Sequence, residues 1–106
     1  INKSLEGVDP ESFKILKSHD PTHWDEQILV YTNIDLTLSG HTHGAQFGIE
    51  IPGWRWSPVD MRYKRWGGFY KEGDQALNVN TGIGFIGFPG RVGMPPEVGL
   101  ITLQKK

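Results

Sequence analysis

The chain has 106 residues, no cysteine and a formal net charge of -1, from eleven lysines and arginines against twelve aspartates and glutamates. The length suits one small domain with its own core, and the balanced charge excludes a sequence-wide attraction to nucleic acid or to an anionic membrane. Disulfides and thiolate ligands are excluded, and no apolar stretch reaches the roughly 18 to 20 residues that span a bilayer, so we expect a soluble chain in which nitrogen and oxygen atoms would bind any metal ion.

A polar lead-in and a short strand are expected first. Residues 1–11 are polar and mixed, with one turn of helix expected around residues 10–11. Apolar and polar side chains then alternate over residues 13–17, which predicts a strand.

A helix is predicted after this strand. Asp20 can accept backbone N–H bonds as the N-cap, and the proline at position 21 suits the first helical position. Trp24, Ile28 and Tyr31 follow at helical spacing and form one apolar stripe. We therefore expect the helix to continue to about Tyr31.

A second strand is predicted over residues 34–39, where Leu36 and Leu38 face the same way. A strand, a helix and a strand in succession imply a right-handed crossover between parallel neighbours, whose carboxyl ends lie at one edge of the sheet. His19 and His41 follow just beyond those two ends. We therefore expect both imidazoles at the same edge.

The second half of the chain changes character. Residues 44–68 hold three of the four tryptophans without sustained periodicity, and we interpret them as an irregular excursion with a short hairpin or edge segment. Strand signals on both sides of residues 73–74 predict a hairpin within residues 69–80.

Residues 81–97 are rich in glycine and proline and predict a long loop of functional or mobile character. The apolar residues 98–103 predict a final strand that is buried on both faces.

The most informative motif is Ser39-Gly40-His41-Thr42-His43-Gly44, which has two histidines one residue apart. Imidazole is the commonest metal ligand, and residues two apart in an extended chain point to the same side, about 6 to 7 Å from each other. His41 and His43 could therefore chelate one metal ion or bind one ion each. With His19, the three nitrogens also suit a single zinc ion that keeps a fourth position for water. The residues by themselves leave these alternatives open.

Three segments carry a resemblance to a known family: residues 18–21 (SHDP), 39–46 (SGHTHGAQ) and 95–103 (PPEVGLITL). They resemble the carboxyl-terminal half of calcineurin-like metallophosphoesterases, in the bacterial branch of phosphohydrolases that are often membrane-tethered. The resemblance covers nearly all of the chain, from about Phe13 onward. It implies an α/β fold class, with residues 1–106 as the carboxyl-terminal part of a β-sandwich flanked by helices.

The resemblance implies a site for two divalent metal ions, manganese, iron or zinc. These ions would activate a bridging water for attack on a phosphomonoester or a phosphodiester substrate. It places His19 and His41 on one ion and His43 on the neighbouring ion. It implies no catalytic residue beyond these metal ligands.

The remaining motifs of the family have no counterpart in this sequence. Asp-x-His, Gly-Asp-x-x-Asp and Gly-Asn-His-Asp/Glu, which supply the other ligands in whole members, are missing. The resemblance therefore implies that the chain needs the upstream half of its domain and is inactive by itself. The branch that the chain resembles has many membrane-associated members, which implies a possible membrane association of the parent protein. Half of a sandwich exposes sheet edges, so we expect self-association or strand exchange of the isolated chain.

Other polar residues near the motifs are candidates for supporting roles. Arg91 and His23 are candidate substrate-binding residues, Arg91 because its forked donors suit phosphate. Asp20, Thr42 and Gln46 are candidates for orienting the imidazole rings by hydrogen bonds.

Two other functions stay open from the sequence. One is a hydrolase that is complete within the chain and holds a single zinc ion on three histidines. The other is a non-catalytic module whose aromatic and glycine-rich half binds a partner. The aromatic residues of this half suit either a wall for a sugar or base or a cover over the sheet; they are Trp54, Trp56, Tyr63, Trp66, Phe69 and Tyr70.

Overall fold

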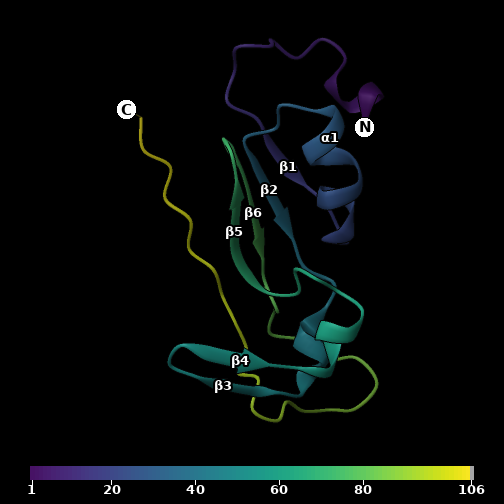
Figure 1. Ribbon diagram of the computed structural model, residues 1–106, viewed down its shortest axis with the longest axis vertical. Coiled ribbons are helices and arrows are strands. Elements are labelled where there is room, and N and C mark those ends of the chain that lie inside the picture. Colours follow the sequence, from purple (N-terminus) through teal and green to yellow (C-terminus); the bar gives the residue numbers. More distant parts are fainter. Residues whose placement is uncertain (106) are drawn as a thin grey trace.

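The computed structural model describes residues 1–105, and its centre is a four-stranded sheet (Figure 1). The strands are β1 (Ile15–Lys17), β2 (Leu36–Ser39), β5 (Gly68–Glu72) and β6 (Gln75–Val79), in the order β1-β2-β6-β5. β1, β2 and β6 are parallel to their neighbours, whereas β5 is antiparallel to β6. The two expected strands and the hairpin around residues 73–74 are confirmed, and the first two strands begin two residues later than expected.

One helical segment connects β1 to β2. Its regular part consists of η2 (Trp24–Ile28), which has π-helical hydrogen bonding, and α1 (Leu29–Tyr31). The carboxylate of Asp20 accepts a hydrogen bond from the backbone N–H of Thr22 at 2.9 Å, as expected for a residue that caps a helix. The predicted crossover between parallel strands is therefore confirmed.

The main core lies between this helical segment and the sheet. Trp24 and Ile28 from η2 pack with Leu77 and Val79 from β6, and all four side chains are fully buried. Tyr31, which we expected on the same apolar stripe, is 69% exposed. The buried part of the stripe therefore ends at Ile28.

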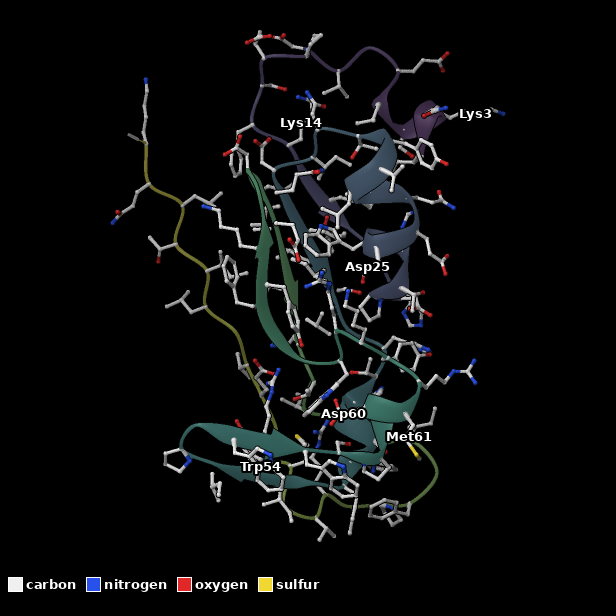
Figure 2. The ribbon with its side chains drawn as sticks, in the orientation of Figure 1. Lys3, Lys14, Asp25, Trp54, Asp60 and Met61 are labelled. Atoms are coloured by element: carbon white, nitrogen blue, oxygen red, sulfur yellow. The ribbon has the colours of Figure 1, made fainter. Side chains whose placement is uncertain are left out.

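A second unit lies at the other end of the molecule (Figure 1). It contains the antiparallel hairpin of β3 (Ile49–Ile51) and β4 (Trp54–Trp56), which confirms the expected short hairpin, and the short helix η4 (Pro58–Met61). Figure 2 shows Trp54 on the hairpin and Asp60 and Met61 on η4 at this same end of the molecule. Val59, Trp66 and Met94 form a small core in this unit.

The amino-terminal helical turn is not where the sequence placed it. The short helix η1 is Asn2–Leu5. Around residues 10–11 the chain instead makes a tight turn, because the Asp9 carboxylate accepts the backbone N–H of Glu11 at 2.9 Å and its carbonyl accepts that of Ser12 at 3.2 Å.

The long loop over residues 81–97 is confirmed, and its one bridge joins Val92 to Phe47. The final strand predicted over residues 98–103 is wrong, because this segment is an extended tail that runs apart from the sheet (Figure 1). Val98 is 85% and Leu100 is 94% exposed. An apolar run forms a buried strand only beside neighbouring strands, and none within residues 1–105 pairs with this one.

The described residues form a mixed α/β structure, in agreement with the predicted class. Among residues 1–105, no helix combines the length and the apolar composition that crossing a bilayer requires.

Candidate metal centre

His19 and His41 lie together at the carboxyl edge of the sheet. Each histidine comes two residues after the end of its strand, β1 or β2, and these strands are parallel neighbours. The centroids of the two imidazole rings are 4.5 Å apart. The carbonyl of His19 accepts the backbone N–H of Gly40 at 3.3 Å and the hydroxyl of Ser39 at 3.0 Å, which ties the two loops together. The predicted convergence of this pair is therefore confirmed.

Asp20 adds a negative charge beside the imidazole pair. One oxygen of its carboxylate, Oδ2, lies 3.9 Å from Nε2 of His41. Burial raises the pKa of Asp20. Hydrogen bonds from Thr22 and the nearby imidazoles of His41 and His19 together lower this pKa by a larger amount, so that the net pKa lies below its usual value. The carboxylate is therefore ionised at neutral pH and favours positive charge at this edge.

His43 is not part of this pair. The expected extended His-x-His arrangement is wrong, because His41 has a φ of 69° and His43 a φ of 51°, which are left-handed backbone conformations. The ring of His43 approaches the loop at Gly84, where a Cβ atom would be 3.8 Å from its Cε1. Its Nδ1 is buried and has no hydrogen-bond partner among the described residues.

These residues fit a metal ion only in part. Two imidazoles supply adjacent nitrogen donors, and the buried Nδ1 of His43 is a polar atom that normally requires a partner. A zinc site complete within the chain needs at least three protein ligands, and no group of three or more suitable side chains occurs within residues 1–105. The chain therefore offers part of a ligand set.

The backbone of the histidine motif is strained. The short helix η3 (His43–Gln46) has positive φ at each residue, from 51° to 58°. For a residue with a Cβ atom this left-handed conformation costs about 1–2 kcal/mol, so it persists only where surrounding contacts hold it. At Gly44 a Cβ atom would also lie 2.8 Å from Cγ of Met94, which leaves room for glycine alone.

Gln46 and Thr42 supply such contacts. The buried amide of Gln46 donates to the carbonyls of Phe88 at 2.9 Å and Gly90 at 2.6 Å, and it accepts the backbone N–H of Ile86. The hydroxyl of Thr42 donates to the carbonyl of Trp66 at 2.6 Å. Both side chains therefore anchor loops around the motif. We expected them to orient the imidazole rings, but within residues 1–105 their hydrogen-bond partners are backbone groups.

Arg91 also binds the backbone. Its guanidinium donates to the carbonyls of Thr81 at 2.7 Å, Gly84 at 2.9 Å and His43 at 3.4 Å. These contacts close the glycine-rich loop against the motif. The forked donors that suggested phosphate binding are thus engaged within the chain.

His23 has partners at both ring nitrogens. Nδ1 lies 2.8 Å from the hydroxyl of Ser18, and Nε2 lies 3.2 Å from the side-chain oxygen of Gln27. The geometry gives His23 a role in joining the end of β1 to the helix, and it leaves no ring nitrogen free for the expected contact with a substrate.

Tyr63 is the residue near the imidazole pair that the sequence analysis missed. Its hydroxyl oxygen lies 3.1 Å from Nε2 of His41, and the two rings meet edge to face at 5.8 Å. The sequence placed Tyr63 only among the aromatic residues that form a wall or a cover. No spacing rule connects residues 22 positions apart, so the contact becomes visible only in the folded chain.

Comparisons with known proteins give matches along nearly the whole chain. A protein of Bos taurus named "Transmembrane protein with metallophosphoesterase domain" is 29% identical over 106 residues, which are 98% of this chain and 22% of that protein. The uncharacterized metallophosphoesterase YkuE of Bacillus subtilis is 32% identical over 95% of this chain and 34% of its own length. An uncharacterized metallophosphoesterase of Helicobacter pylori is 32% identical over 100% of this chain and 27% of its own length.

The chain matches proteins named as metallophosphoesterases along nearly its whole length, which confirms the predicted resemblance to that family. It spans between 22% and 34% of the length of these three relatives. No protein-family model matches the chain, and no solved structure matches it significantly.

Proposed function

We propose that this chain is part of a divalent-metal-dependent phosphoesterase that hydrolyses phosphomonoesters or phosphodiesters. The observation that carries the proposal is the pairing of His19 and His41, 4.5 Å apart at one edge of the sheet, in a chain related to metallophosphoesterases. Two bound ions, manganese, iron or zinc, would supply charge stabilisation of the phosphoryl oxygens and would lower the pKa of the attacking water.

The histidines of the chain act in this proposal as neutral nitrogen donors. His19 and His41, which follow the ends of β1 and β2, would hold one ion, and His43 would be a ligand of the neighbouring ion. The unpartnered Nδ1 of His43 supports this role, since a buried polar atom gains a partner when it ligates. Asp20 keeps the edge negative and so favours a cation beside His41.

The remaining ligands would come from outside this chain. In support, the described residues contain no group of three metal-ligating side chains, and the chain spans at most 34% of the three relatives compared above. The alternative of a complete three-histidine zinc site requires all three rings in one group, so the observed geometry favours the shared two-ion site. The isolated chain would then be catalytically poor.

The exposed tail supports a partner within the same domain. Val98, Leu100 and Leu103 are apolar and at least half exposed, which is costly in water for a segment of this length. We propose that the upstream half of the domain covers the tail in the parent protein, and that copies of the isolated chain pair through it. Light scattering tests the second statement, and a monodisperse monomer would contradict it.

The parent protein is proposed to be membrane-associated. The support is that the relatives from Bos taurus and Danio rerio are named as transmembrane proteins with a metallophosphoesterase domain. The measurement is the distribution of the parent between membrane and soluble fractions, and recovery entirely in the soluble fraction would contradict the proposal.

The test of the enzymatic proposal compares the chain alone with the chain joined to the rest of its domain. Both are assayed with Mn²⁺ on p-nitrophenyl phosphate and on bis(p-nitrophenyl) phosphate. We expect activity only in the joined protein and its loss in His41→Ala, whereas Asn33→Ala, an exposed residue beyond α1, retains it. Equal activity of the isolated chain, or unchanged activity in His41→Ala, would contradict the proposal. A non-catalytic interaction module would bind little metal and hydrolyse neither substrate.

A further inference from the structure

Two oxygen-bearing groups converge on the same nitrogen of His41. The hydroxyl oxygen of Tyr63 lies 3.1 Å from Nε2, and the carboxylate oxygen Oδ2 of Asp20 lies 3.9 Å from it. Within residues 1–105, no group forms a hydrogen bond to the other ring nitrogen, Nδ1. The two nitrogens of His41 therefore have different surroundings, and only Nδ1 is free.

The hydroxyl of Tyr63 is held in place by the unit that contains η4. The backbone N–H of Tyr63 donates to the carbonyl of Val59 at 2.8 Å, and its ring packs against the small core of Val59, Trp66 and Met94. The helix η4 is itself fixed by a capping box between Ser57 and Asp60. Tyr63 is thus a rigid partner for His41, since both its backbone and its ring are anchored.

This arrangement selects one tautomer of His41. A neutral imidazole carries one N–H and one lone pair, and the hydrogen bond at one nitrogen decides which nitrogen keeps the lone pair. An ionised carboxylate only accepts hydrogen bonds, so Asp20 favours the proton on Nε2. The hydroxyl oxygen of Tyr63 can accept a hydrogen bond from this N–H and still donate its own hydrogen elsewhere. Nδ1 then keeps the lone pair.

We infer that Tyr63 is a positioning residue, whose hydroxyl acts with Asp20 to hold the proton of His41 on Nε2 and to present Nδ1 as the metal-binding nitrogen. The inference rests on the proposed function, because it assigns Tyr63 a part in the same site. Groups that orient a ligating histidine in this way typically contribute 10-fold to 100-fold to metal affinity. The edge-to-face contact between the rings also fixes the direction in which Nδ1 points.

The experiment uses the metal-free chain with Tyr63→Phe, which keeps the aromatic ring and removes only the hydroxyl. Long-range ¹H–¹⁵N NMR spectra at about pH 8, where an ordinary imidazole is neutral, report the tautomer of His41. We expect the Nε2–H form in the unmodified chain and a mixture of both forms in Tyr63→Phe. Calorimetric titration with Zn²⁺ should show an affinity about 10-fold lower for the variant. Tyr31→Phe is the control, because Tyr31 is 69% exposed at the end of α1 and forms no contact with His41 among those found in residues 1–105.

Two results would overturn the inference. One is a His41 that carries its proton on Nδ1 in the unmodified chain, and the other is a tautomer that Tyr63→Phe leaves unchanged. Failure of the proposed function gives a different result, which is unchanged hydrolysis by His41→Ala in the joined protein. The NMR measurement needs neither metal nor substrate, so it decides on Tyr63 in both cases.

Discussion

The sheet with its helix and the region around the histidine motif are stabilised in different ways. The sheet–helix unit, residues 13–39 and 68–79, is held by burial of apolar side chains between η2 and β6. The motif region, residues 40–67 and 80–97, has a small core and depends on polar side chains that bind the backbone of its loops. Apolar burial tolerates small changes of geometry, whereas a left-handed backbone held by hydrogen bonds does not. The imidazole pair lies where the two regions meet.

The largest expected effect is in the sheet–helix unit. Trp24→Ala removes a fully buried ring from the main core, and we expect the free energy of unfolding to fall by about 3–5 kcal/mol. Urea denaturation followed by circular dichroism measures the change. Trp54→Ala is the matched control, because Trp54 is 53% exposed on the hairpin, and it should change stability by less than about 0.5 kcal/mol. Equal losses in the two variants would contradict the assignment of the core.

The second effect tests the strained backbone of the motif region. Gly44→Ala adds a methyl group 2.8 Å from Cγ of Met94 at a φ of 58°, and we expect a loss of about 2–4 kcal/mol from strain and overpacking together. Gly73→Ala is the control, since its φ of 57° is nearly the same and a Cβ atom there meets nothing within 4 Å. It should lose only the backbone part, about 1–2 kcal/mol. Thermal unfolding compares the two, and a larger loss in Gly73→Ala would be inconsistent with this structure.

The third effect is local. Gln46→Leu removes the amide that binds Phe88 and Gly90, and it leaves their carbonyls without this partner, at a cost of about 1–3 kcal/mol. Hydrogen exchange followed by mass spectrometry should show faster exchange over residues 84–92 and unchanged protection of β2 and β6. Gln104→Leu, in the exposed tail, is the control. Uniformly faster exchange throughout the sheet would mean that the two regions are not separable.

The smallest effect concerns the link between the regions. Arg65 lies in the motif region and contacts Asp25 of η2 at 3.1 Å and Glu72 of β5 at 2.9 Å. Arg65→Lys keeps the charge but loses the fork that reaches both carboxylates, so we expect a loss of about 1 kcal/mol. The loss should shrink at high salt. Arg62→Lys, at an exposed position with no carboxylate partner among the described residues, should be neutral within about 0.5 kcal/mol.

The same contrast explains what the sequence could predict. Asp20, the alternating residues of the strands and the turn at residues 73–74 act locally, so the helix, the parallel strands and the convergence of His19 with His41 follow from short patterns. The conformation of Gln46 depends on carbonyls more than forty residues away. No local pattern contains that information.

The remaining differences have the same physical origin. Residues 98–103 were expected as a buried strand, but burial requires neighbouring strands that residues 1–105 do not provide. The extended shape expected for His-x-His fails because Arg91 and Gln46 hold the motif against the glycine-rich loop. The hydrogen bond between His41 and Tyr63 likewise joins residues far apart in sequence. These features are set by long-range packing.

The metal content of the joined protein, measured by elemental analysis after dialysis against Mn²⁺, tests the proposed two-ion centre directly. We expect about two ions per molecule in the unmodified protein, and about one in each of His41→Ala and His43→Ala, because we propose that the two histidines bind neighbouring ions. Full metal content in both variants would contradict a shared two-ion centre. Complete loss of metal from both variants while both remain folded would also contradict it.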